Sequence, residues 1–373
     1  MAGDATARVR QLIAESGLTQ AEFAVKAGLD APKMSKSLSG VRRFTSLDLA
    51  RIADLCGVSV DWLLRTDPVT PATAARTATV PLKSADSAIR EAERLAQLRA
   101  DLAFLGYHQE VPRFALTRMS ASCMDQGRDL AALATTHAAQ KGIALWRCRD
   151  LAGAVEAAFG VDVRVHRLAD GFDGLSWSDD HSSLIVVGTS EVPARQRFTI
   201  AHELGHLLAG DDQGLHVDAD IHDTEHKSKP SEKRANTFAA ELLLPAEMLR
   251  EKTHGITWSL EAFALLACEL WVSPSTLAWK LFNLHLIDKR QCNSFRGLTA
   301  WEAARKANAV ESLGEWIQQT SRSRIPAPLV RTTFQAYADG KATLRPYANL
   351  IGVATDTLRA AISDMREDSP PES

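Results

Sequence analysis

A five-residue pattern on one apolar helix constrains this 373-residue chain more than any other feature. His202 and His206 stand with Glu203 in the order His-Glu-x-x-His, within a run from Pro193 to Gly210 that carries apolar residues at helical spacing. Residues four apart on a helix are separated by about 40° around its axis, so the two imidazoles point to one place. Glu203 lies about 100° from His202, where it can take a proton from a water beside a metal. The pattern therefore predicts two zinc ligands and a general base.

The third zinc ligand has to come from the chain after this helix. Candidate side chains crowd the stretch 211–233: Asp211, Asp212, His216, Asp218, Asp220, His222, Asp223, Glu225, His226 and Glu232. Helical phase favours Glu232, which heads the apolar stripe of a helix predicted over 231–245, whereas Glu241 faces away as a solvated charge. His216, His222 and His226 stay open as alternatives. Asn236, one turn after Glu232, is a candidate to orient a ligand, or else makes an ordinary helix-to-loop hydrogen bond.

These motifs resemble those of the ImmA/IrrE family of zinc metallopeptidases. The likeness is carried by residues 195–206, RQRFTIAHELGH, and by residues 232–245, EKRANTFAAELLLP, within a region of roughly 140–285. The resemblance implies that His202, His206 and Glu232 bind zinc and that Glu203 is the catalytic base. It also implies cleavage of partner transcriptional repressors, often those of mobile elements or DNA-damage regulons.

The first 66 residues follow a different pattern, of five short helices divided by glycines. Helices are predicted over 7–16, 20–27, 31–38, 47–56 and 60–65. Residues 18–40 resemble the helix-turn-helix of the lambda-repressor/Cro group, with Thr19 as a helix cap, Gly28 in the turn, and Met34 and Leu38 in the core. The resemblance implies a domain that binds double-stranded operator DNA.

The docking geometry of this motif places its second helix in the major groove. The outward residues there are Ala31, Pro32, Lys33, Ser35 and Lys36, and those near phosphates are Gln20, Arg42 and Arg43. Nine Lys and Arg against seven Asp and Glu in this segment leave a small positive excess, so one copy would bind DNA weakly and a homodimer or a second contact is implied. A protein-interaction bundle is the alternative.

The remaining sequence completes a multidomain prediction. Residues 67–83, rich in Pro, Ala and Thr, are typical of a linker. Residues 84–290 hold predicted helices over 84–105, 129–140 and 146–159, strands over 161–166, 174–177 and 183–188, and an α+β zincin-like peptidase core over about 140–285. The edge of the small sheet would accept an extended peptide. Residues 291–373 are predicted as a helical region with a disordered tail, and Trp271 and Trp279 are expected in the core. The expected fold is thus an all-α five-helix domain, an α+β peptidase domain and C-terminal helices.

Composition narrows the remaining possibilities. A hydrophobic fraction of 45% excludes a disordered chain, and no stretch approaches a membrane span or a secretory leader. Five cysteines without metal or disulfide spacing fit a reducing compartment, so we expect a cytoplasmic, nucleoid-associated protein.

Two functions fit the sequence: a DNA-tethered zinc endopeptidase that cuts a partner repressor or antitoxin, or a repressor whose peptidase-like domain is a sensor. Glu203 favours the first, because a sensor needs no general base.

Overall fold

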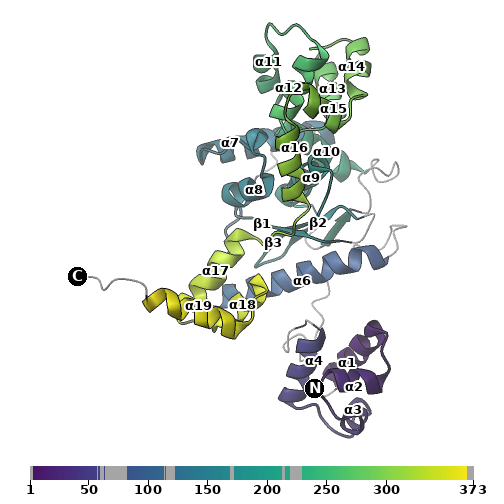
Figure 1. The fold of residues 1–373 in the computed structure, drawn as a ribbon, viewed down its shortest axis with the longest axis vertical. Coiled ribbons are helices and arrows are strands. Elements are labelled where there is room, and N and C mark those ends of the chain that lie inside the picture. The colour runs from purple at the N-terminus through teal and green to yellow at the C-terminus, as the bar shows by residue number, and fades with distance from the viewer. Residues whose placement is uncertain are drawn as a thin grey trace, which may run out of the picture. The chain divides into compact units, whose positions relative to one another are not determined.

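The computed structural model describes residues 3–56, 58, 63, 82–112, 114, 122–168, 172–211, 215–218 and 229–367. The chain divides into two compact units, Met1–Pro71 and Ala72–Ser373 (Figure 1). The helix predicted over 60–65 (apart from Leu63), the linker predicted over 67–83 (up to residue 81) and the tail over 369–373 lie outside the described residues.

The N-terminal unit is helical throughout its described part. Its elements are α1 (Gly3–Ser16), α2 (Gln20–Lys26), α3 (Ala31–Leu38) and α4 (Ser46–Cys56). They pack around a core that includes Phe23, Met34 and Ile52. Thr19 caps α2 in a reciprocal capping box with Glu22, and Gly28, at φ 65°, makes the turn into α3. This is the helix-turn-helix that the sequence predicted.

A four-stranded mixed sheet lies at the centre of the second unit. Its strands are β1 (Asp162–His166), β2 (Gly174–Ser178), β3 (Ser183–Gly188) and β4 (Leu215–Asp218), in the order β1-β3-β2-β4. β3 runs parallel to β1 and antiparallel to β2, which also pairs antiparallel with β4. The first three strands match the predicted ones within a residue. β4 was not predicted, because its segment is short and rich in acidic and histidine residues.

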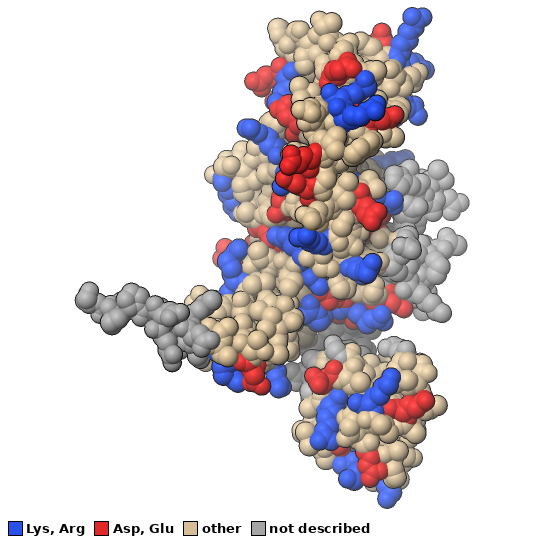
Figure 2. Space-filling view, in the orientation of Figure 1, with Lys and Arg blue, Asp and Glu red and all other residues tan. Residues whose placement is uncertain are grey.

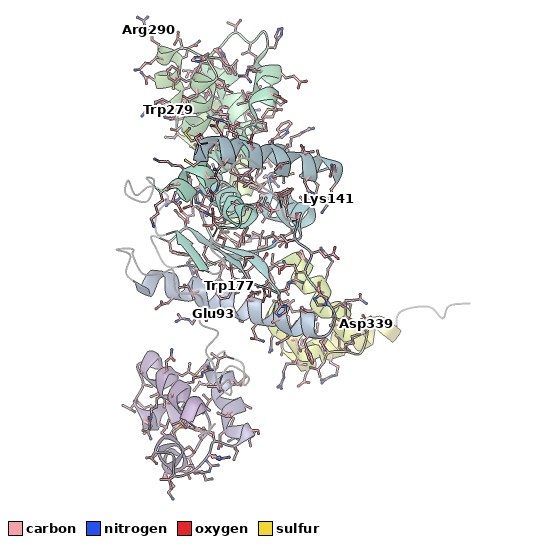
Figure 3. All side chains as sticks on the ribbon, turned by 180° about the vertical axis from the view of Figure 1, so that it is seen from behind. Glu93, Lys141, Trp177, Trp279, Arg290 and Asp339 are labelled. Carbon is pink, nitrogen blue, oxygen red and sulfur yellow. The ribbon has the colours of Figure 1, made fainter. Side chains whose placement is uncertain are left out.

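Helices cover both faces of this sheet (Figure 1). Ile185 and Val187 of β3 pack into the core formed with α8 (Leu151–Phe159) and α9 (Pro193–Ala209). Leu184 and Val186 alternate to the other face and pack with α6 (Leu82–Phe104). Trp177 lies on the α6 side as well (Figure 3). A strand buried on both sides has no polar face, which explains the unbroken apolar run of β3.

One predicted helix, over 146–159, is interrupted in the structure. After α7 (Cys123–Gln140), a single 3₁₀ turn covers Leu145–Arg147, and α8 begins only at Leu151. The Asp150 carboxylate accepts a hydrogen bond at 3.1 Å from the Gly153 N–H and caps α8. Aspartate competes for backbone donors in this way, so a helix starts at it rather than running through it.

The helices after residue 245 fall into two groups. The first group comprises α11 (Ala246–Thr253), α12 (Leu260–Glu269), α13 (Pro274–Asn283) and α14 (Lys289–Arg296), which surround one apolar cluster, and α15 (Ala300–Lys306), which packs against α12. Trp279 lies in this lobe (Figure 3), but it is 44% exposed beneath the Arg296 guanidinium, so the expectation of a core residue is wrong there. Glu241 also differs from expectation, because it pairs with Lys280 at 2.6 Å instead of being solvated.

The second group returns to the sheet. It comprises α16 (Val310–Thr320), α17 (Ala327–Ala338), α18 (Leu344–Ile351) and α19 (Thr355–Glu367). Leu329, Ala336 and Leu350 pack with α6 against the sheet. Arg324 forms a 2.6 Å ion pair with the buried Glu156, and a β-bridge joins it to Val165 on β1. α17 and α18 are therefore part of the core that carries the sheet.

Across the part of the chain described above, no single helix is both long and apolar enough to cross a bilayer. Only α12 together with α13, bent by 105° at their junction, passes that test of length and composition as a pair. All five cysteines are described, and none of them forms a disulfide.

Candidate metal centre

The helix α9 carries the His-Glu-x-x-His pattern through the middle of the core. Pro193 occupies its first turn, and Gly210 ends it in the left-handed conformation at φ 68°. The side chains of His202, Glu203 and His206 are all fully buried. Apolar residues on the same helix, such as Leu204 and Leu208, anchor it in the core, so the imidazoles extend from a rigid support.

Two polar residues near the start of α9 fix the helix to its surroundings. Arg197, which is 3% exposed, donates hydrogen bonds to five backbone carbonyls, of Leu145, Trp146, Cys148, Leu270 and Trp271. Burial lowers the pKa of this guanidinium to about 10, so it stays charged at neutral pH. Gln196 donates to the carbonyls of Gly188 and Thr320. These contacts set the position of α9 against β3 and α16.

The third predicted ligand arrives on the next helix, α10 (Pro230–Leu243). Glu232 lies in its first turn and is 6% exposed. α10 crosses α9 so closely at Gly205 that a Cβ atom there would lie 2.9 Å from Cδ1 of Phe238. The missing side chain of Gly205 is therefore what lets α10 bring Glu232 up to the two histidines.

The donor atoms of these three side chains converge. Nε2 of His206 lies 3.1 Å from Nε2 of His202, and the Glu232 oxygens lie 3.4 Å and 3.5 Å from the two histidine nitrogens. Zinc bonds of about 2.0–2.2 Å in a tetrahedral site place neighbouring donors roughly 3.3–3.6 Å apart. Two imidazole nitrogens and a carboxylate at this separation fit a zinc ion, because a cation relieves the repulsion between their lone pairs.

His206 has a further partner on its other ring nitrogen. Nδ1 lies 3.0 Å from Oδ2 of Asp211. The left-handed Gly210 turns the chain back, and the Asp211 N–H donates to the His206 carbonyl at 3.1 Å. The sequence alone offers Asp211 only as one of ten candidates for the third ligand. The usable signal was its position directly after a helix-ending glycine and five residues after a histidine.

The other predicted residues are placed as follows. Glu203 is buried beside the two histidines on α9. Asn236 is half-buried one turn after Glu232, and its role in orienting a ligand stays a prediction. Of the alternative ligands, His216 lies in β4, where only the backbone is described, and His222 and His226 lie outside the described residues.

The predicted DNA-reading residues lie on the surface of the N-terminal unit. Lys33, Ser35 and Lys36 are exposed on α3 and Ala31 is half-buried, while Gln20 and Arg43 are exposed beside it. An open hollow of about 380 Å³ is lined by side chains of α1, α2 and α3 and by the residue after α3: Arg10, Ile13, Gln20, Ser35, Leu38 and Ser39. Arg42, the remaining predicted phosphate contact, forms an ion pair with Asp48 at 3.0 Å. Figure 2 shows basic and acidic side chains intermixed on the visible face of this unit.

Fold and site together define a class of protein. A buried His-Glu-x-x-His helix beside a small mixed sheet, with a glutamate from the following helix, is the arrangement of a zincin-like metallopeptidase domain. Residues 156–282 match the family model of the IrrE N-terminal-like domain, and residues 5–63 match that of a helix-turn-helix domain. The chain therefore carries one region that matches a helix-turn-helix domain and one that matches the metallopeptidase domain of the ImmA/IrrE type, as the resemblance in its sequence implied.

Two relatives are similar to part of the chain. The radiation response metalloprotease IrrE of Deinococcus radiodurans is 36% identical over 151 residues, covering 36% of this chain and 44% of that protein. The protein of the same name from Deinococcus deserti is 32% identical over 151 residues, covering 36% of this chain and 52% of that protein. The chain thus spans about half the length of the curated relatives that it matches.

Proposed function

We propose that this chain is a DNA-binding zinc endopeptidase that regulates transcription by cleaving a partner protein, a repressor or an antitoxin. The observation that carries the proposal is the convergence of His202, His206 and Glu232 within 3.1–3.5 Å of one another. A constellation of this kind on two packed helices is costly to bury without a cation, and the fully buried Glu203 lies on the same helix as the two histidines.

The chemistry follows from the residue types. When bound, zinc lowers the pKa of a water molecule and polarises a peptide carbonyl. His202, His206 and Glu232 would hold it. Glu203 takes the proton of the attacking water and passes it to the amide nitrogen as the C–N bond breaks, so that a carboxyl and an amine are released. The fixed position of α9 keeps this base aligned with the peptide bond.

The sheet supplies a place for the substrate. The β1 edge is already bridged to Arg324 through Val165, and the opposite edge of the sheet is formed by β4. An extended peptide would add along the β4 side as a further strand, with main-chain hydrogen bonds holding it and side-chain pockets selecting it. This mode of binding suits an endopeptidase, because it needs no free chain end.

The N-terminal unit would bring the peptidase to its substrate. A helix-turn-helix domain bound to an operator, as a homodimer or with a second contact, places the enzyme beside the repressor that occupies the same DNA. Tethering of this kind raises the local substrate concentration to roughly the millimolar range, so a weakly binding enzyme can still be selective.

The test uses the purified full chain. We expect one zinc per chain by metal analysis and cleavage of the repressor or antitoxin that is encoded beside it. Glu203→Gln should keep the zinc and slow cleavage by about 10²–10⁴-fold, because it removes only the base. A chain that binds no zinc, or a Glu203→Gln variant that cleaves normally, would contradict the proposal.

The same variant separates the second function. In cells, Glu203→Gln should still occupy the operator but no longer release genes held by the partner. If that strain regulates its genes as the parent does, proteolysis is dispensable, and the chain is a transcriptional repressor with a peptidase-derived sensor.

A further inference from the structure

The candidate metal centre extends outward through a chain of polar contacts. His206 Nδ1 lies 3.0 Å from Oδ2 of Asp211, and the other oxygen of that carboxylate accepts a hydrogen bond from Nη2 of Arg234. Nη1 of Arg234 donates to Oε1 of Gln126 at 3.2 Å. The contacts run from α9, through the residue after its C-terminal glycine, to α10 and on to α7.

This chain of contacts is shielded from solvent. The side chains of Asp211 and Arg234 are 14% and 15% exposed, so the charged hydrogen bond between them is only weakly screened by water. An ionised carboxylate can only accept, so the Asp211 contact places the hydrogen of His206 on Nδ1. Nε2, the atom that faces His202 and Glu232, is then left with its lone pair.

The base of the Arg234 side chain is itself fixed. α7 and α10 cross at Gly127, where a Cβ atom would lie 2.6 Å from the Arg234 carbonyl oxygen. The crossing sets the Arg234 backbone, and the Gln126 contact holds its guanidinium. Arg234 therefore presents a fixed donor to Asp211.

We propose that Arg234 is a positioning residue of the metal centre, which acts through Asp211 to hold His206 in the tautomer and ring rotation that direct Nε2 to the metal. This inference rests on the proposed function, because it assumes that the three ligands hold zinc. Partners of metal-ligating histidines fix ring orientation and ligand basicity in this way, and their loss weakens metal binding about 10–100-fold. A purely structural link between α9 and α10 would instead stabilise the fold without affecting the metal.

The test measures how fast the full chain loses zinc to a chromophoric chelator. Asp211→Ala and Arg234→Met should each speed zinc loss about 10–100-fold. The double variant should lose zinc no faster than the faster single variant, because both substitutions break the same chain of contacts from Arg234 through Asp211 to His206. Arg234→Lys should restore part of the wild-type rate. Arg195→Ala, which breaks a 2.7 Å ion pair with Asp173 near the start of α9, is the matched control and should leave the rate unchanged.

Two further measurements separate positioning from folding. Melting temperatures of the metal-free variants report on the fold, and the visible spectrum of the cobalt-loaded protein reports on ligand geometry. We expect the spectrum to change in Asp211→Asn, which keeps the size of the side chain but loses its charge and replaces one acceptor oxygen by an N–H donor, while the metal-free variant still melts in one cooperative transition. The proposal would be overturned if both single variants lost zinc at the wild-type rate, or if the accelerations of the two single variants added up in the double variant. If the wild-type chain holds one zinc and these variants retain it equally well, Arg234 has no such role and the proposed function stands. If the wild-type chain holds no zinc, the role of Arg234 and the proposed function both fail.

Discussion

His202, Glu203 and His206 are fully buried on α9, whereas Lys33, Ser35 and Lys36 are exposed on α3. The buried residues are held by a packed core and by the five carbonyl contacts of Arg197, so their geometry exists before any substrate arrives. The exposed residues, which we predict to contact DNA, lie at the surface of the N-terminal unit. Substitutions of the histidines in the first region should therefore change metal binding and activity together, whereas Glu203→Gln should change activity alone. Substitutions in the second region should change only the affinity for DNA.

The largest effect should come from removing a ligand in the buried region. Glu232→Gln and His206→Ala should each weaken zinc binding by about 100-fold or more, since even the partners of ligands are worth 10–100-fold. Metal analysis after dialysis against a chelator measures this. His216→Ala is the matched control and should keep its zinc. Full zinc in Glu232→Gln together with loss in His216→Ala would show that the ligand assignment is wrong.

A smaller effect is expected on the exposed helix. Replacing both Lys33 and Lys36 with alanine should weaken specific operator binding by about 1–3 kcal/mol for each base that the two side chains recognise. Zinc content and melting temperature should not change, in contrast to the ligand variants. Replacing the exposed Lys289 and Arg290 of α14 removes two like charges as a control. Unchanged operator affinity in the α3 variant would show that DNA binds to another surface.

A change in packing where α9 and α10 cross should affect both the stability of the fold and the retention of zinc. Gly205→Ala would place a methyl group 2.9 Å from Phe238 and push α10 away from α9. We expect a loss of about 1–3 kcal/mol in the free energy of unfolding, with faster zinc loss, and partial rescue by Phe238→Leu. Gly314→Ala on α16, where nothing lies within 4 Å, is the control. Equal stability of both variants would mean that the close crossing does not constrain Glu232.

The smallest effect concerns acid stability of the peptidase unit. Burial opposes ionisation of Glu91, but Arg94 and Arg164 outweigh it and lower the pKa of Glu91 from 4.5 to about 2. A lowered pKa contributes stability above pH 4.5 that is lost as the pH falls toward 2. Denaturant unfolding of Glu91→Gln should therefore show a flatter dependence on pH across this window than wild type. Asp356→Asn, in an exposed pair on α19, should keep the wild-type slope.

The spacing of a few residues was enough to predict the helices and the candidate ligands. His202 and His206 are four residues apart on a helix, so their side chains point to the same side. Glu232 lies on the apolar face of its predicted helix, and this position was enough to predict that it is buried. The same logic gave β3, because a strand covered on both faces is apolar throughout. Each of these signals is local, since it depends only on neighbours along one element.

Other features depended on contacts between distant segments. The partnership of Asp211 with Arg234 spans 23 residues and depends on how α10 crosses α7 and α9. Glu241 had the phase of a solvated charge, yet Lys280 from α13 reaches it across the fold. Local patterns do not encode which element packs against which, so these two contacts were not predicted. The 3₁₀ turn before α8 has a local cause instead, because Asp150 caps α8 and competes with helix continuation, a signal that the prediction overlooked.

The pairing of Arg324 with Glu156 limits where the second unit can be shortened. A fragment ending at residue 282, where the family match ends, would keep all three candidate ligands and lose Arg324. It would leave the Glu156 carboxylate, 3% exposed, without its cation, and would strip Leu329 and Ala336 from the α6 face of the sheet. Removing one partner of a buried pair costs about 3–5 kcal/mol, a large part of a domain's stability. We therefore expect the shortest fragment of the second unit that folds on its own to extend through α18, well past the last candidate ligand.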